Sequence, residues 1–235
     1  MNYNPVIIAL DYTETEQALA LVKKIGPAAG FYKIGPVLFL RSGKEIIAEL
    51  KKKDKKIFLD LKFYDIPNTV EQAAFQAAKL EIDFFTIHLG GGRQMIESAL
   101  RGIEQAGSSA RRKTRCLGVS VLTSISPEIL KNELNVNIGL SEYAGCLTGM
   151  AAACGIDGIV CSPHETAGIR EKHPSPFLIV NPGIRMPEDA AGDQKRVSSP
   201  GQAVKAGADY LVIGRSITDA DNPAEKLKAV LADII

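Results

Sequence analysis

The stretch KIFLDLKFYDIPNT, residues 56–69, contains the transition that decides the fold. Its first four residues are mostly apolar and predict a buried strand, while residues 69–80 place apolar side chains at helical spacing. A strand followed at once by a helix is typical of a parallel α/β protein. The charged residues Asp60, Lys62 and Asp65 therefore lie at the C-terminal end of a strand, which is where α/β proteins carry their chemistry.

The same unit recurs along the whole chain of 235 residues. Eight short runs rich in apolar residues are predicted as strands: 6–11, 31–35, 56–62, 84–89, 116–123, 158–162, 177–183 and 210–215. Eight helical patterns follow them: 15–25, 43–53, 69–80, 94–105, 141–154, 164–171, 200–206 and 223–235. Strands that alternate with helices imply a parallel sheet whose strands are joined by right-handed crossovers.

Two architectures satisfy this alternation. An open doubly wound sheet usually carries a glycine-rich nucleotide-binding turn after its first strand, but residues 9–13 are ALDYT. The glycines at 90–92 follow the fourth run instead and lack the G-x-G-x-x-G spacing. We therefore predict α/β architecture as a single (β/α)8 TIM barrel. Because no linker-like segment divides the chain, residues 1–235 are expected to form one catalytic domain.

Composition excludes several classes of protein. With 28 basic and 27 acidic residues the formal net charge is +1, so we expect no nucleic-acid partner and no attraction to an anionic membrane. The lysine-rich run 51–56 fits the solvated end of a helix. No stretch approaches the length of an apolar membrane span, and the N-terminus lacks the pattern of a signal peptide.

The four cysteines predict neither zinc binding nor disulfides. Cys116, Cys146, Cys154 and Cys161 form no C-x-x-C pair, and only three histidines could join them as metal ligands. We interpret the cysteines as small core residues of a reduced, cytoplasmic protein.

In a barrel of this kind, active residues gather at the C-terminal ends of the strands. Candidate residues do follow six of the eight predicted strands: Asp11, Lys33, the cluster Asp60 to Asp65, Thr123, Arg185 and the run Gly214-Arg215-Ser216. His88 also ends a strand, but a lone histidine there is interpreted as structural.

The charged cluster favours catalysis over a purely structural role. Asp60 and Lys62 are two residues apart, so on an extended strand both side chains point to the barrel interior, where Lys33 would add a second ammonium. A network of ion pairs that only fixes the barrel register is the alternative, but its desolvation cost disfavours it. A lysine among carboxylates keeps its proton and suits a general acid. An aspartate held near a substrate carboxylate would disfavour that anion until it leaves as carbon dioxide.

The last two predicted strands indicate a phosphate site. Barrels often bind phosphate through backbone N–H groups of the loops at this position, and Arg185 and Arg215 add planar guanidinium donors. The long polar stretch 186–200 is either a closing lid that reaches the phosphate through Gln194 or a mobile surface loop. After Pro67, Asn68 or Thr69 is expected to cap the next helix.

These residues together resemble the orotidine 5′-phosphate decarboxylase family, in particular its bacterial form. The resemblance covers essentially the whole chain. It rests on ALD at 9–11, KIG at 33–35, DLKFYDIPNT at 60–69, VLTS at 121–124, PGIR at 182–185 and IGRS at 213–216. The decapeptide is the most specific of these motifs.

The resemblance implies a substrate and a set of roles. The substrate is orotidine 5′-monophosphate, which is decarboxylated to UMP and CO2 in the last step of de novo pyrimidine synthesis. Lys62 would donate a proton to C6 of the pyrimidine, Asp60 would face the substrate carboxylate, and Lys33 would complete the charge network. The other implied contacts are Asp11 and Lys33 to ribose, Thr123 to the base, and Arg185, Gln194, Gly214 and Arg215 to phosphate. Whether Ser124 or Ser126 also helps hold the base stays open.

The family also implies a homodimer with shared active sites and no metal or organic cofactor. Asp65 and Thr69 would reach into the partner's site, Asp65 as a catalytic residue and Thr69 as a substrate-binding residue. Ile66 would also contribute to substrate binding.

Two alternatives remain. The magnesium-dependent sugar-phosphate decarboxylases and aldolases of the same suprafamily share the D-x-K-x-x-D pattern, but they carry a metal-binding glutamate where this chain has Lys33, and a charged lysine cannot bind magnesium. A non-catalytic barrel that binds a phosphoribosyl ligand should have lost at least one of Lys33, Asp60, Lys62 and Asp65, and all four are present.

Overall fold

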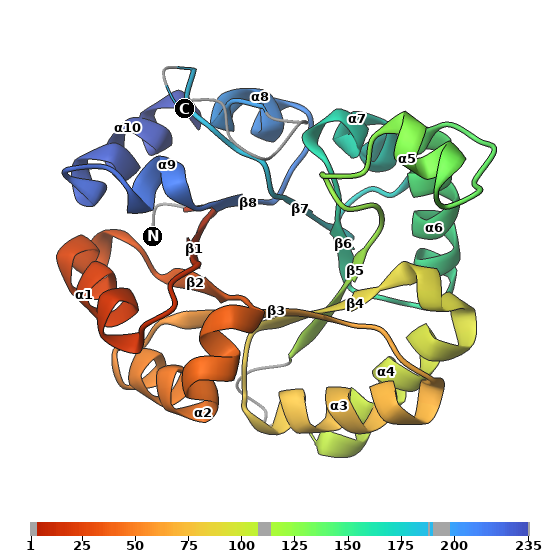
Figure 1. Cartoon of the computed structure of the whole chain (residues 1–235), viewed down its shortest axis with the longest axis horizontal. Helices are drawn as coiled ribbons and strands as arrows, with labels where there is room; N and C mark the ends of the chain where they lie inside the picture. The colour runs from red at the N-terminus through yellow and green to blue at the C-terminus, as the bar shows by residue number, and fades with distance from the viewer. Residues whose placement is uncertain (1–3, 108–113, 188, 190–197, 235) are drawn as a thin grey trace.

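The computed structural model describes residues 4–107, 114–187, 189 and 198–234. Its eight strands form one closed parallel barrel in chain order, in which β8 pairs back to β1. Figure 1 looks into the barrel, with the helices forming a ring around it. The predicted (β/α)8 fold is confirmed.

The strands and helices occur where the sequence pattern places them, with changes at their ends. The strands are β1 Val6–Leu10, β2 Phe31–Ile34, β3 Lys56–Phe63, β4 Phe84–His88, β5 Arg115–Val119, β6 Gly158–Val160, β7 Leu178–Asn181 and β8 Tyr210–Ile213. The helices are α1 Thr15–Ile25, α2 Pro36–Lys52, α3 Pro67–Lys79, α4 Gly92–Ala106, α5 Pro127–Asn132, α6 Leu140–Ala153, α7 Pro163–Lys172, α8 Pro200–Lys205, α9 Arg215–Thr218 and α10 Pro223–Ile234. Two 3-10 turns, η1 Gly26–Ala28 and η2 Leu89–Gly91, complete the set.

Some predicted boundaries were wrong. The fifth strand ends at Val119, so Thr123 belongs to the following loop, because Val121 and Leu122 continue the apolar run without continuing the sheet. Helix α2 begins seven residues earlier than predicted and passes through a kink at Gly43, whose φ is 44°. The short helices α5 and α9 contain too few turns to show a period, and the sequence pattern did not reveal them.

Two apolar layers hold the barrel together. Side chains such as Ile8, Leu10 and Ile34 point outward and pack against the helices. The interior layer is made of the alternate residues, including Ile7, Phe31 and Phe58.

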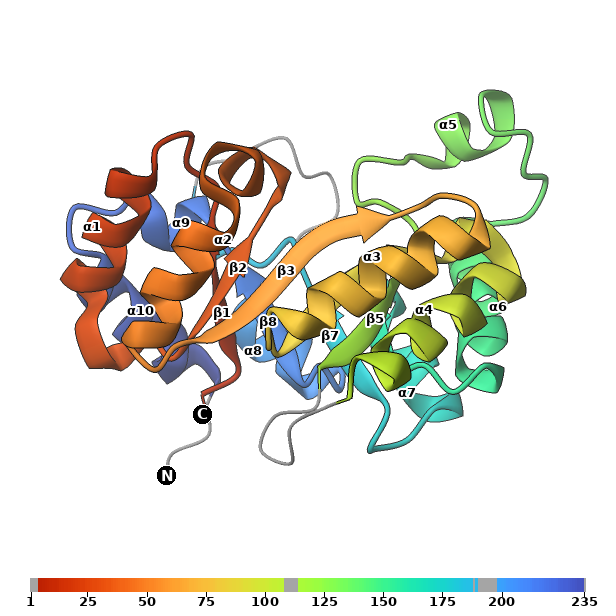
Figure 2. The same cartoon turned by 90° about the horizontal axis from the view of Figure 1, so that it is seen from below.

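Aromatic rings fill the N-terminal half of this interior. The ring of Phe84 lies 5.0 Å from Phe31, 5.3 Å from Tyr210 and 5.9 Å from Phe58 between centroids. Each of these residues is at the start or middle of its strand, so the opposite, C-terminal end of the barrel is left for polar side chains. Figure 2 shows this end as the side toward which the arrow of β3 points.

The cysteines only partly match the prediction. Cys116 and Cys161 are buried, but Cys146 is exposed on α6, and Cys154, the C-cap of α6, is half-buried at the edge of the core. All four are free thiols. Over the described ranges, no helix is both long and apolar enough to cross a membrane.

Candidate active site

A cavity of about 680 Å³ lies at the C-terminal mouth of the barrel. Its floor is apolar and includes Phe58, Val119 and Val160. The predicted site residues in its wall are Asp11, Lys33, Asp60, Lys62, Thr123, Arg185, Gly214 and Arg215. The structure thus brings residues from six loops and strand ends, distant in the sequence, to a single cavity. Asp65, Ile66 and Thr69 do not line it, and Gln194 lies outside the described residues.

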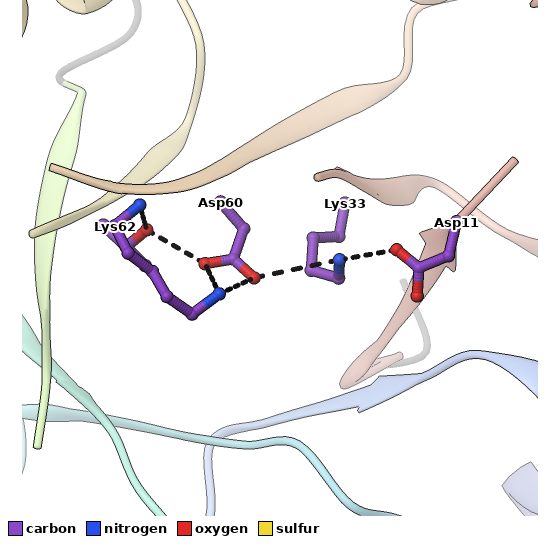
Figure 3. A network of polar contacts seen from close by, with 5 residues as sticks. Asp11, Lys33, Asp60 and Lys62 are labelled. Carbon is purple, nitrogen blue, oxygen red and sulfur yellow. Dashed lines mark hydrogen bonds and ion pairs between the residues drawn. The ribbon is translucent and has the colours of Figure 1, made fainter. Parts of the chain in front are cut away.

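Four charged side chains cross one wall of the cavity with alternating sign (Figure 3). Lys33 Nζ lies 2.9 Å from Asp11 Oδ1 and 3.8 Å from Asp60 Oδ2. Lys62 Nζ donates to both carboxylate oxygens of Asp60 at 3.0 Å. The side chains of Lys33 and Asp60 are only 11% and 13% exposed, whereas that of Asp11 is 64% exposed. The inner members of the row are therefore desolvated, and the outer aspartate faces solvent.

The strand that carries Asp60 and Lys62 is irregular. The pairing of β3 with β4 shifts register between Leu59 and Phe63, and Lys62 has a φ of 50°. A regular extended strand was expected to bring the two side chains to one face, and that explanation was wrong. They meet with Lys62 in a left-handed backbone conformation, which is uncommon for a residue with a side chain and, in a strand at a cavity wall, is a feature of functional sites.

The sequence did not reveal Thr86 on β4. This residue is fully buried, and its hydroxyl contacts both Asp60 and the backbone of Lys62. The signal available in the sequence was a polar residue inside the apolar run FFTIH, two positions before its end. By the alternation of the strand, that position faces the interior together with Phe84.

The opposite wall of the cavity is built by the loops after β7 and β8. Helix α9 starts at Arg215, directly after Gly214, so its first N–H groups lie at the cavity. The stem of the β7 loop is closed by hydrogen bonds from Arg185 N to Ser198 O at 3.1 Å and from Ser198 N to Gly183 O at 3.2 Å.

Asp189 connects this loop to the helices next to it. Its carboxylate accepts hydrogen bonds from Ser216 Oγ, from Lys226 Nζ at 2.8 Å and from Met186 N at 2.9 Å. Burial alone would raise the pKa of Asp189, but these hydrogen bonds outweigh it and lower the pKa. The negatively charged carboxylate of Asp189 therefore connects the loop after β7, which carries Arg185, with α9, which begins at Arg215.

The second half of the decapeptide turns away from the cavity. Asp65 and Thr69 are exposed, and Asp65 Oδ1 accepts a hydrogen bond from the N–H of Ile66 at 2.7 Å. Helix α3 begins at Pro67, with Ile66 as its N-cap. The predicted cap by Asn68 or Thr69 was wrong, because Pro67 starts the helix and both residues already belong to its first turn.

His88 supports this segment from β4. Its ring stacks on Tyr64 with centroids 5.3 Å apart, and Nδ1 accepts a hydrogen bond from Gly90 N at 3.2 Å. Burial, and then the charge of Lys62, lower the pKa of His88. The neutral ring required by that hydrogen bond is thus favoured, which agrees with a structural role.

Comparison with known proteins gives a consistent result. The model of the family described as Orotidine 5′-phosphate decarboxylase / HUMPS matches residues 4–230. An orotidine 5′-phosphate decarboxylase of Nostoc sp. is 43% identical over 235 residues, which is 100% of this chain and 98% of that protein. The enzyme of the same name from Fusobacterium nucleatum is 42% identical over 225 residues, 96% of this chain and 93% of its own length. The crystal structure of orotidine 5′-phosphate decarboxylase from Lactobacillus acidophilus superposes with a TM-score of 0.87 at 40% identity, covering 98% of each chain.

Proposed function

We infer, because this chain belongs to the orotidine 5′-phosphate decarboxylase / HUMPS family, that it converts orotidine 5′-monophosphate to UMP and CO2. It is a carboxy-lyase of pyrimidine biosynthesis. The observation that supports this function best is the buried pairing of Asp60 with two ammonium groups in a cavity whose other wall carries Arg185 and Arg215. Such a cavity suits a substrate with an ionised group at each end.

We propose that the row of four charges performs the chemistry. When the C6–carboxylate bond breaks, its electron pair stays on C6 and the carboxylate leaves as CO2. Lys62 Nζ then gives a proton to C6, which yields UMP, and the amine takes a proton back from water. Lys33 and Lys62 both stabilise the negative charge that develops at C6. Asp60 holds Lys62 by two hydrogen bonds and faces the position of the departing carboxylate.

The substrate lies across the cavity in this proposal. Asp11, exposed at the rim, accepts a hydrogen bond from a ribose hydroxyl. Lys33, whose ammonium lies between Asp11 and Asp60, also contacts the ribose. Thr123 contacts the pyrimidine ring. The 5′-phosphate binds at the loop after β8, through Gly214 and Arg215 at the start of α9, and to the guanidinium group of Arg185. Gln194 also binds the phosphate in this proposal.

We propose a homodimer in which each active site is completed by the other chain. Asp65, Ile66 and Thr69 are exposed and face away from their own cavity, so they are free to reach a partner's cavity. The 67% exposed Ile66 and the 63% exposed Tyr64 are large apolar side chains next to Asp65, and burial by a second copy would remove them from water. We also propose that residues 1–235 form one domain and that the enzyme works in the cytoplasm, for which its four free thiols are suited.

The magnesium-dependent members of the suprafamily are the alternative. The ammonium of Lys33 occupies the space between the carboxylates of Asp11 and Asp60, where a cation would have to bind. The ammonium of Lys33 already supplies the positive charge there, and a lysine has no oxygen atom that could bind magnesium.

The test is the loss of orotidylate absorbance with purified protein in the presence of EDTA. We expect full turnover with the chelator, and release of one CO2 for each UMP formed. Turnover that requires added magnesium, or turnover of a sugar phosphate in place of orotidylate, would contradict the proposal.

A further inference from the structure

We propose that Thr86 is a positioning residue for this reaction, because its hydroxyl fixes Asp60 and Lys62 relative to each other. The inference rests on the proposed function, since it concerns the two residues placed at the reacting carbon. Thr86 does not line the cavity and so does not itself touch the substrate.

The contacts of Thr86 are short, and Thr86 itself is completely buried. Thr86 is 0% exposed on β4, the strand next to β3. Its Oγ1 accepts a hydrogen bond from the backbone N–H of Lys62 at 2.8 Å and donates one to Asp60 Oδ1 at 2.9 Å. One hydroxyl thus bridges the backbone of the proposed acid and the side chain of its carboxylate partner.

The irregular strand explains why this hydroxyl is needed. Because β3 shifts register against β4 between Leu59 and Phe63, Lys62 lies where the regular pairing of the two strands is interrupted, and its N–H bonds to the Thr86 hydroxyl. The hydroxyl thus gives a hydrogen-bond acceptor to the part-buried N–H of Lys62, whose backbone is left-handed with φ 50°.

The direction of the two hydrogen bonds is fixed by chemistry. A hydroxyl has one proton, and a backbone N–H can only donate, so Thr86 must use its proton for Asp60. Each oxygen of the Asp60 carboxylate then has identified partners. Oδ1 accepts from Thr86 and Lys62, while Oδ2 accepts from Lys62 and faces Lys33 Nζ at 3.8 Å. Without Thr86 only the two long lysine side chains orient the carboxylate, so Asp60 and Lys62 Nζ can shift together.

The variant Thr86→Val tests this proposal, because valine has the shape of threonine without the hydroxyl. We expect kcat, expressed per UMP-binding site, to fall by about 10²-fold, the size of effect seen when one preorganised donor is removed. UMP affinity should stay within about threefold, since none of the groups proposed to bind ribose or phosphate is altered. Thr86→Ser restores the hydroxyl and should recover kcat to within about fivefold of the wild type.

A second readout isolates the proton transfer. In D2O, exchange of the C6 hydrogen of UMP, followed by NMR, involves Lys62 but no carboxylate on the base. We expect the rate of C6 hydrogen exchange in Thr86→Val to fall together with kcat. Thr148→Val is the matched control, since Thr148 is also 0% exposed but donates only to the carbonyl of Ala144 within α6, at 2.7 Å. It should lose stability without losing kcat per site.

Several results would overturn the inference. They are an unchanged kcat per site in Thr86→Val, a loss that Thr86→Ser does not recover, and an equal loss in Thr148→Val. If Thr86→Val does not fold, Thr86→Ala carries the same test because it also removes the hydroxyl. A wild type without orotidylate turnover is a different result, which refutes the proposed function itself and the inference with it.

Discussion

The two halves of the decapeptide at residues 60–69 differ in the environment of their charges. In the first half, Asp60 and Lys62 are paired with each other and with groups from β2 and β4 inside the cavity wall. In the second half, Asp65 is exposed, and its carboxylate accepts a hydrogen bond from the next residue of its own turn. The same short motif therefore contains a site that is assembled within one chain and a segment that is not.

This difference separates two kinds of functional residue. A desolvated ion pair such as Lys62 with Asp60 needs well-placed partners, and the fold of a single chain supplies them. Asp65 is exposed and does not line the cavity of its own chain, so a strong effect of Asp65 on activity would have to come from a second copy of the chain. Four substitutions test this division, from the largest expected effect to the smallest.

The largest effect is expected for Lys62→Ala in the first half. Removal of the proposed general acid should lower kcat by about 10⁴-fold, the upper end of the range for such a group, while UMP still binds. The measurement is single-turnover loss of orotidylate absorbance, together with calorimetry for UMP. Lys56→Ala, at the exposed start of the same strand, is the control and should leave kcat unchanged. Retention of near-normal kcat in Lys62→Ala would show that another group is the acid.

The second half is tested by Asp65→Ala, which should lower kcat by about 10²-fold. The unfolding midpoint of the monomer, measured at low protein concentration, should not change, because the carboxylate is exposed in the single chain. Mixing equal amounts of the Asp65→Ala and Lys62→Ala chains should recover about one quarter of wild-type activity. This follows because half of the dimers are mixed and each mixed dimer contains one site with neither lesion. If subunit exchange is demonstrated by native mass spectrometry and no activity returns, the shared site is ruled out.

A smaller effect is expected for Ile66→Ser, which removes an exposed apolar side chain of the second half. We expect the dimer to dissociate at about tenfold higher concentration, measured by analytical ultracentrifugation. The monomer should unfold as before, since Ile66 is 67% exposed. Ile66→Val keeps an apolar contact and should dimerise like the wild type. Equal dissociation constants for all three proteins would place the interface elsewhere.

The smallest effect concerns His88, which holds Tyr64 of the second half by ring stacking. The lowered pKa of His88 means that the unfolded chain takes up a proton before the folded chain does as pH falls. The full contribution of His88 to the free energy of unfolding is therefore present above about pH 6.5 and is lost as the pH falls toward the lowered pKa of His88. In urea unfolding, the loss between pH 7.5 and pH 5.5 should be smaller in His88→Gln by less than about 1 kcal/mol.

The sequence predicted most of the fold because strand burial and helix period are local properties. It also predicted that Asp11, Lys33, Asp60 and Lys62 meet, since the ends of parallel strands converge in a barrel. It did not predict Thr86, because the hydroxyl accepts a hydrogen bond from the backbone N–H of Lys62, which is 24 residues away. Lys62 lies where β3 shifts register against β4, and the sequence pattern does not show that shift. The outward direction of Asp65 and Thr69 was equally hidden in the local pattern, because β3 ends at Phe63 and strand alternation no longer applies. In that case only the family resemblance had pointed to a partner.

The closure of the barrel between β1 and β8 has a consequence for how the protein is made. Val6 pairs with Leu211 and Ile8 with Ile213, so one side of the first strand has its partner near the other end of the chain. During translation that side stays open until β8 has left the ribosome. Contacts of such high sequence separation slow folding, and an unpaired strand edge invites aggregation until it is covered. The newly made chain is thus most vulnerable in the interval before β8 is synthesised.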